Sequence, residues 1–283
     1  MDVLMRGATL EDQLDDPEVR ILECTMNLRR EETTGTYTVE SGLADWQEGH
    51  IPNSAYVDLG TELSEPHPSL RFSWPTAERV KRVMERLGVG AGTRVVVYDR
   101  QMNMWATRVW WLLHAYGFDR VCVLDGGWAA WTHDGRPVST ASAPPRPAAA
   151  FTPVPRAGCV ATKDDVMTAI ASGATCIVNS LSAAQHRGED LSYGRPGHIP
   201  SAINVPAAGL VDRVTYQYLD LDTLRQRFAD ALSRDRVITY CGGGIAATSD
   251  AFVLTGLLGH PDVGVYDGSM SEWVADPDAP LEV

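Results

Sequence analysis

Residues 237–249 read Val-Ile-Thr-Tyr-Cys-Gly-Gly-Gly-Ile-Ala-Ala-Thr-Ser. This pattern predicts a short strand, a cysteine at its end, a glycine-rich turn and then a helix from Ala246 to Leu258. The N–H groups of such a turn can point at the sulfur of Cys241, and the helix start adds a partial positive charge. Both effects favour the thiolate, so we predict a nucleophile that can also carry an anionic group such as a persulfide. The alternative is a buried structural cysteine, for which three consecutive glycines would be a poor choice.

The chain also contains a long-period internal repeat. Tyr98 precedes Asp99 as Tyr240 precedes Cys241, and an offset of 142 residues relates the two pairs. The same offset relates several other markers: Gly117 and Gly259, Asp125 and Asp267, Trp131 and Trp273. Two Gly-His-Ile-Pro motifs begin at Gly49 and Gly197. We therefore predict a duplicated domain in which only the second copy carries the thiol.

The predicted domains are residues 1–138 and 158–283, joined by a Pro- and Ala-rich linker over residues 139–157. Short apolar runs alternate with amphipathic segments in each half, which indicates a parallel sheet flanked by helices, an α/β fold. The expected central strands are Arg94 to Tyr98 and Val237 to Tyr240. Ligands of such sheets bind beyond the carboxyl ends of the strands, where Cys241 lies.

Composition excludes several classes of function. The formal net charge is −13, which argues against nucleic-acid binding and against docking on an anionic membrane. The five cysteines are odd in number and lack metal-ligand spacing, so we expect a reduced, cytoplasmic protein without a metal site. No apolar run is long enough for a membrane span or a signal peptide.

These motifs, taken together from about Val19 to Trp273, resemble the tandem-domain rhodaneses, the thiosulfate and 3-mercaptopyruvate sulfurtransferases. In that family the C-terminal domain carries the catalytic cysteine, and the N-terminal domain has an aspartate in its place. Cys241 and Asp99 follow this pattern.

The resemblance implies two tandem rhodanese-like domains and a ping-pong mechanism. The Cys241 thiolate would take the outer sulfur of a small anionic donor and become a persulfide. An acceptor such as cyanide, a small thiol or a protein thiol would then remove that sulfur. No metal or organic cofactor is implied. The loop amides expected to hold the persulfide belong to Gly242, Gly243, Gly244, Ile245, Ala246 and Ala247.

The loop and the first half depart from the family pattern. Thiosulfate-preferring members usually have cationic side chains in this loop, whereas Cys241 to Gly244 is neutral, as in mercaptopyruvate-preferring members. The latter use a loop hydroxyl and a first-domain His and Asp as a proton relay. Here Gly243 takes the place of the hydroxyl residue and Phe72 that of the His, while Asp58 matches the Asp. His67 lies five residues before Phe72 and would need a shifted loop to act.

The anion-binding segment of the second half is altered as well. Two arginines expected from the family are replaced by Leu181 and Gln185. Arg187 and Arg195 remain as candidate anion binders, although either could be a solvated surface residue. His186 lies beside the site and could be a base or only a packed ring. Loss of two positive charges should weaken thiosulfate binding. The pocket should then accept a larger or less charged donor.

Three other functions are alternatives to sulfur transfer for this sequence. A cysteine-dependent phosphatase needs an arginine six residues after the cysteine, where this chain has Ala247. A non-catalytic persulfide sensor or protein-binding module would explain the missing arginines but not the intact glycine loop. A dedicated sulfur-delivery protein for a biosynthetic pathway would suit the altered pocket.

Overall fold

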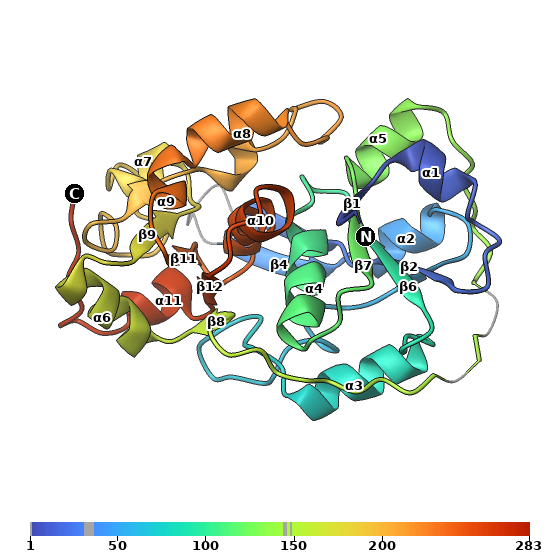
Figure 1. The fold of residues 1–283 in the computed structure, drawn as a ribbon, viewed down its shortest axis with the longest axis horizontal. Helices are drawn as coiled ribbons and strands as arrows, with labels where there is room; N and C mark the ends of the chain where they lie inside the picture. Colours follow the sequence, from blue (N-terminus) through green and yellow to red (C-terminus); the bar gives the residue numbers. More distant parts are fainter. Residues whose placement is uncertain (1, 31–36, 144–145, 148) are drawn as a thin grey trace. The chain divides into compact units, whose positions relative to one another are not determined.

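The computed structural model describes residues 2–30, 37–143, 146–147 and 149–283 (Figure 1). The chain forms two compact units. Unit 1 comprises Met1–Glu65, Trp74–Arg156 and Val211–Tyr218, and unit 2 comprises Pro66–Ser73, Ala157–Leu210 and Leu219–Val283. Each half of the sequence thus contributes one short segment to the other unit. The division after Arg156 falls inside the segment that the sequence predicts as a linker.

Each unit is built on a five-stranded parallel sheet. The strand order in unit 1 is β1-β7-β6-β2-β5, and in unit 2 it is β10-β9-β11-β12-β8, the same arrangement given from the opposite edge. The strands are β1 (Leu4–Met5), β2 (Val19–Glu23), β5 (Ser54–Tyr56), β6 (Arg94–Tyr98), β7 (Val121–Leu124), β8 (Val160–Ala161), β9 (Cys176–Asn179), β10 (Ile203–Asn204), β11 (Val237–Tyr240) and β12 (Val263–Tyr266). The predicted α/β fold with two parallel sheets is confirmed.

Helices flank both sheets (Figure 1). In unit 1 they are α1 (Gly7–Glu11), α2 (Leu43–Glu48), α3 (Ala77–Arg86), α4 (Met104–Ala115) and α5 (Gly127–His133). In unit 2 they are α6 (Lys163–Ser172), α7 (Ala183–His186), the 3₁₀ turn η1 (Ala207–Gly209), α8 (Leu221–Arg227), α9 (Ala229–Leu232), α10 (Ala246–Phe252), the π-helical turn η2 (Val253–Leu257) and α11 (Ser269–Trp273). Among the described residues, none of these helices combines the length and apolarity that a bilayer span requires.

Each sheet packs one face on a compact core. In unit 1 that core joins alternate residues of the central strands to Leu10 of α1 and Trp131 of α5. In unit 2 the equivalent core centres on Tyr240 and Trp273, both fully buried. Full burial of aromatic and β-branched side chains explains why these strands are readable from the sequence, because a buried parallel strand is a continuous apolar run.

Several elements differ from the predicted ones. Residues 221–232 form two helices, α8 and α9, because Phe228 leaves helical geometry and buries its ring completely. The helix expected from Ala246 to Leu258 is α-helical only to Phe252 and continues as a π turn. The antiparallel hairpin of β3 (Met26–Arg30) and β4 (Tyr37–Ser41) was not predicted.

Equivalent hydrogen bonds confirm the duplication. Tyr98 Oη accepts a hydrogen bond from Ile51 N at 3.2 Å, and Tyr240 Oη accepts one from Ile199 N at 3.1 Å. Each Gly-His-Ile-Pro motif is thereby fixed to the end of its central strand. The indole N–H groups of Trp131 and Trp273 donate to Pro137 O and Pro280 O, both at 2.8 Å. The paired tryptophans thus have the same structural role in both units.

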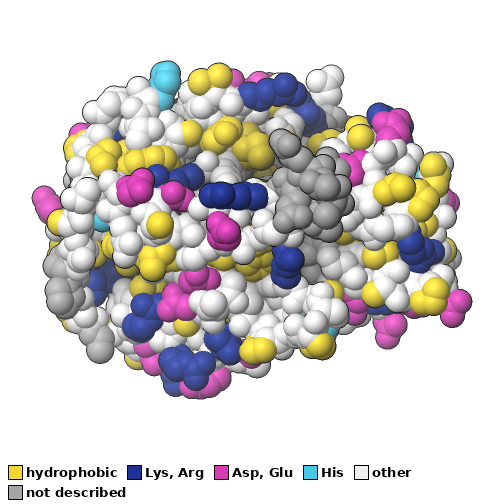
Figure 2. Space-filling view, turned by 180° about the vertical axis from the view of Figure 1, so that it is seen from behind, with side chains coloured by type: hydrophobic (Ala, Val, Ile, Leu, Met, Phe, Trp, Pro, Cys, Tyr) yellow, Lys and Arg dark blue, Asp and Glu magenta, His cyan; other side chains and the backbone are white. Residues whose placement is uncertain are grey.

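Charges on the surface are mixed. On the face drawn in Figure 2, described basic and acidic side chains are interspersed, and neither sign covers that face.

Candidate active site

Cys241 follows the central strand β11 and is 2% exposed. The strand pairs with β9 on one side and β12 on the other, so the cysteine lies at the middle of the carboxyl edge of the sheet. The glycine turn after it leads directly into α10, which begins at Ala246. The structure therefore has the strand, turn and helix start that the sequence predicts.

Two serines of helix α11 hold the Cys241 loop in place. Ser269 Oγ accepts hydrogen bonds from Cys241 N and Gly244 N, both at 3.1 Å, and donates to Tyr266 O at 2.7 Å. Ser271 donates to Gly242 O through its amide at 2.9 Å and through its hydroxyl at 2.7 Å. These bonds hold both ends of the glycine turn, so the position of the thiol is set by a packed element.

The remaining amides of the loop are available to an anion. Within the described chain, no acceptor is recorded for the N–H groups of Gly242, Gly243, Ile245, Ala246 and Ala247. A buried N–H without a partner is costly, which favours a ligand or reaction intermediate that supplies an acceptor.

The equivalent loop of unit 1 follows Asp99, and its backbone N–H groups surround an anionic side chain; we call this set of N–H donors the cradle. The carboxylate of Asp99 accepts four backbone N–H groups, from Gln101 (2.7 Å), Asn103 (3.1 Å), Trp105 (2.8 Å) and Ala106 (2.8 Å). Burial raises the pKa of Asp99 to about 7, and the four N–H groups act in the opposite direction. Because every neighbour is a donor, the ionised form fits the cradle. With the offset of 142 residues, the first three donors correspond to Gly243, Ile245 and Ala247.

Glycine is required at two positions of the Cys241 loop for different reasons. A Cβ on Gly242 would lie 1.7 Å from Tyr193 Oη, so the phenol packs directly against the loop. Gly244 has a φ of +73°, in the region that favours glycine. Gly243 is different, because a Cβ there would meet only Ser271 Oγ at 3.9 Å.

His186 belongs to a packed pair of rings. It stacks on His198 with centroids 3.6 Å apart, and Asn179 Nδ2 donates to its Nδ1 at 3.1 Å. Burial, followed by the nearby His198 and Arg187, lowers the pKa of His186 to about 4. The equivalent pair in unit 1 is Trp46 stacked on His50, so this position is a stacking partner in both halves. That parallel favours the packed-ring interpretation of His186.

The two candidate arginines have other partners. Arg187 is exposed and forms an ion pair with Glu189 at 2.7 Å. Arg195 donates to the carbonyl oxygens of Asp276 and Ala279 at 2.8 and 2.9 Å, which attaches the C-terminal segment to unit 2. The prediction that Arg195 binds an anion is not favoured, because its guanidinium is occupied by backbone carbonyls.

Residue Gln185, which replaces an expected arginine, has a structural task. Its side chain accepts hydrogen bonds from Ser182 N and Ser182 Oγ at 3.2 and 3.0 Å, completing the capping box of α7. Gln185 therefore caps the start of α7, and its side chain is neutral where the expected arginine would carry a positive charge.

The relay candidates from the first half lie in different units. Asp58 is half-buried in unit 1 and accepts a hydrogen bond from Thr61 N at 2.9 Å. His67 and Phe72 belong to the segment Pro66–Ser73, which groups with unit 2, the unit that carries Cys241. His67 Nδ1 accepts the amide of Leu70 at 2.9 Å, and Phe72 has a φ of +57°. The structure does not place Asp58 and His67 in one unit.

Three residues of this site were missed by the sequence reasoning: Tyr193, Ser269 and Ser271. A signal for Ser269 existed, because the repeat aligns Asp267-Gly268-Ser269 with Asp125-Gly126-Gly127. Ser269 and Gly127 share a φ of +49°, an unusual value for serine. Among the described residues, no three His, Cys, Asp or Glu side chains are grouped as a metal site would require.

Comparison with known proteins agrees with this architecture. The model of the rhodanese-like domain matches residues 8–134 and 183–276. The chain is 32% identical to the 3-mercaptopyruvate sulfurtransferase of Escherichia coli (strain K12), over 96% of this chain and 95% of the relative. It is 32% identical to a thiosulfate sulfurtransferase of Gallus gallus, over 81% and 80%. The crystal structure of SseA from Escherichia coli, described as a 3-mercaptopyruvate sulfotransferase, superposes with a TM-score of 0.82 at 27% identity, covering 95% of this chain and 99% of that one.

Proposed function

Because the chain belongs to the rhodanese-like domain family, we propose that it is a sulfurtransferase that moves sulfane sulfur from a small donor to a thiophilic acceptor through a Cys241 persulfide. The thiolate attacks the outer sulfur of the donor and forms the new S–S bond. The donor's own bond to that sulfur breaks, and its electron pair leaves with sulfite or with the enolate of pyruvate. An acceptor thiol or cyanide then takes the outer sulfur and regenerates the thiolate.

The observation that carries this proposal is the carboxylate of Asp99 in its four-amide cradle. Each oxygen of that carboxylate lies two bonds from Cβ, as the outer sulfur of a Cys241 persulfide would. The equivalent amides of Gly243, Ile245 and Ala247 have no acceptor among the described residues, which supports their use by that sulfur.

We propose 3-mercaptopyruvate, or a donor of similarly low charge, in preference to thiosulfate. The loop from Cys241 to Ala247 has no cationic side chain, and Gln185 serves a helix cap where the family has an arginine. A divalent anion would therefore find little charge compensation near the sulfur. We place the reaction in the cytoplasm, since all five cysteines are free thiols in the structure.

Steady-state kinetics test the reaction and the donor preference together. Double-reciprocal plots at several acceptor concentrations should be parallel, as a persulfide intermediate requires, and kcat/KM should be higher for 3-mercaptopyruvate than for thiosulfate. Intersecting lines would contradict the covalent intermediate, and a preference for thiosulfate would contradict the donor assignment.

Gly243→Ser tests whether the pocket lacks a proton relay. A Cβ at this position meets only Ser271 Oγ at 3.9 Å, so the added hydroxyl fits. We expect kcat for 3-mercaptopyruvate to rise in Gly243→Ser and to stay unchanged in Gly243→Ala, which adds the carbon without the hydroxyl. Equal kcat values for both variants would show that another group already supplies the proton.

A further inference from the structure

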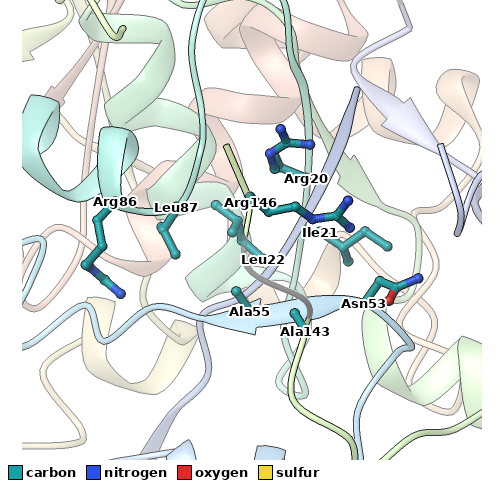
Figure 3. A pocket seen from close by; sticks show the side chains of 9 residues that line it. All are labelled: Arg20, Ile21, Leu22, Asn53, Ala55, Arg86, Leu87, Ala143 and Arg146. Atoms are coloured by element: carbon teal, nitrogen blue, oxygen red, sulfur yellow. The ribbon is translucent and has the colours of Figure 1, made fainter. Parts of the chain in front are cut away.

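A separate pocket of about 200 Å³ lies in unit 1, on the sheet side that faces the C-terminal end of α3. Figure 3 shows Arg86 at one end of it, Arg20 and Arg146 toward the other, and Leu22, Ala55 and Ala143 between them. Among the described residues, no acidic side chain belongs to the lining. Three arginines therefore line one pocket of a chain with a formal net charge of −13, and one of them, Arg86, is paired with Glu62.

Arg20 is built into the wall of this pocket. The residue is 6% exposed, and it donates through Nε to Gly88 O at 2.9 Å and through Nη1 to Pro17 O at 2.7 Å and Val19 O at 3.0 Å. All three acceptors are neutral carbonyls. Burial, with a further contribution from the charge of Arg146, lowers the pKa of Arg20, while Asp16 opposes the shift. Among the described residues, Asp16 thus offsets only part of the cost of burying Arg20 beside Arg146, so an anion bound between the two guanidinium groups would be stabilised.

Arg146 is positioned by packing of the linker. A Cβ on Gly88 would lie 2.8 Å from Arg146 Cβ, and a Cβ on Gly90 would lie 2.6 Å from Ala150 O, so the linker lies directly on both glycines. Phe151 N also donates to Glu85 Oε1 at 3.3 Å. Within the described chain, however, the guanidinium of Arg146 has no recorded hydrogen bond or ion pair, whereas Arg86 pairs with Glu62. The Cβ of Arg146 therefore packs against Gly88, while its charged group has no partner among the described residues.

We propose that this pocket is a binding site for a small oxyanion, a carboxylate or a phosphate group carried on a compact apolar body. The guanidinium of Arg146 and the free Nη2 edge of Arg20 would hold the charged head, because the planar fork of arginine matches both carboxylate and phosphate oxygens. The side chains of Leu22, Ala55 and Ala143 would contact the apolar body. A pocket of this size suits a small molecule. This site is independent of the Cys241 reaction.

Titration calorimetry on the full chain tests this site with three probes: inorganic phosphate, acetate and butanoate. Ionic strength is kept constant with sodium chloride so that general screening does not change. We expect saturable binding in the millimolar range, tighter for butanoate than for acetate, because the longer chain reaches the apolar residues. Tighter phosphate binding would assign a phosphate head, and tighter butanoate binding a carboxylate.

Arg146→Gln should weaken binding of the best probe by roughly tenfold or more, since a charge-assisted hydrogen bond is lost. The matched control is Arg82→Gln, an exposed arginine on α3 outside the pocket, which should bind as the unchanged protein does. Arg146 lies on the linker and Arg82 is exposed on α3, so both variants should keep the melting temperature of the unchanged protein. The melting temperatures are measured first. Absence of saturable binding by every probe, or equal affinity of Arg146→Gln and the unchanged protein, would overturn the proposal.

Discussion

At the scale of single residues, the three glycines after Cys241 are not equivalent. Gly242 is in contact with Tyr193, and Gly244 has a left-handed backbone, whereas a Cβ on Gly243 would meet Ser271 Oγ only at van der Waals distance. The sequence alone presents them as one flexible run. Only the neighbours, which come from α11 and from the loop that carries Tyr193, distinguish them.

Gly242→Ala and Gly243→Ala form a matched pair that separates these roles. The new Cβ of Gly242→Ala would overlap Tyr193 Oη, so we expect the free energy of unfolding to fall by about 1–3 kcal/mol. Gly243→Ala should change it by less than about 0.5 kcal/mol. Urea denaturation measures both. If Gly242→Ala is as stable as Gly243→Ala, Tyr193 moves freely and does not support the loop.

His186 should stay neutral well below the pH at which an ordinary histidine gains a proton. Its pKa is lowered to about 4 by burial and by its neighbours His198 and Arg187. Asn179 donates to Nδ1, so Nε2 carries the proton. NMR of labelled histidine rings should show a neutral Nε2–H ring at pH 5.5. A protonated ring at that pH would contradict the packed-pair description.

The same shift predicts a contribution to stability. Because the folded-state pKa is below the unfolded one of about 6.5, the unfolded chain takes up the proton first. The contribution is therefore present above pH 6.5 and is lost as pH falls toward 4. His186→Phe, which keeps a stacking ring on His198, should unfold with a weaker pH dependence across this range.

At the scale of elements, the cradle is made by a strand end, a turn and the start of α11 acting together. Ser269 is its centre, because its hydroxyl accepts two loop amides while its backbone takes a φ of +49°. Gly127 has the same φ in unit 1, where Trp128 N donates to Asp99 O as Met270 N donates to Cys241 O. In the second half, the unfavourable backbone conformation of Ser269 is thus offset by the two hydrogen bonds that its hydroxyl accepts from the loop amides.

Ser269→Ala should destabilise the protein by about 2–4 kcal/mol, because it leaves the buried amides of Cys241 and Gly244 without acceptors. It should also slow sulfur transfer, since both ends of the loop loosen. Ser271→Ala is the control: Ser271 N still binds Gly242 O, so a loss of about 1 kcal/mol or less is expected. Thermal unfolding and initial rates of both variants test whether Ser269 supports the loop more strongly than Ser271 does. Equal losses would remove Ser269 from its assigned role.

Elements buried on both sides were predictable, and the others were not. The central strands β6 and β11 have the predicted bounds because their side chains form continuous apolar runs. The hairpin of β3 and β4 was missed because each strand has only two apolar residues, separated by a polar one, so the alternation is very short. The π turn after Phe252 was missed because apolar side chains continue through it, and periodicity does not reveal one extra residue in a turn.

At the scale of the whole molecule, duplication explains what the sequence could reveal about the site. Two copies with a constant offset identified Cys241 as the residue that replaces a structural Asp99, and the hydrogen bonds of both loops agree. Side-chain partners could not be predicted in the same way. The C-terminal segment that occupies Arg195 and the ion pair of Arg187 arise from contacts distant in sequence.

The sequence pattern also does not reveal that each half contributes a short segment to the other unit. Val211–Tyr218 groups with unit 1, where Tyr218 N donates to Asp125 Oδ1 at 2.9 Å and Asn103 Nδ2 donates to Tyr216 O at 2.8 Å. Pro66–Ser73 groups with unit 2. Tyr216 and Phe72 have φ values of +55° and +57°, which are rare for aromatic residues.

The central claim is that Cys241 carries sulfur between donor and acceptor. Its most direct test is intact-protein mass spectrometry after incubation with 3-mercaptopyruvate or thiosulfate, and then with cyanide. We predict a gain of one sulfur atom, larger with 3-mercaptopyruvate, removed by cyanide and absent in Cys241→Ser. A protein that gains no sulfur from either donor, or a Cys241→Ser variant that gains it equally, would contradict the claim.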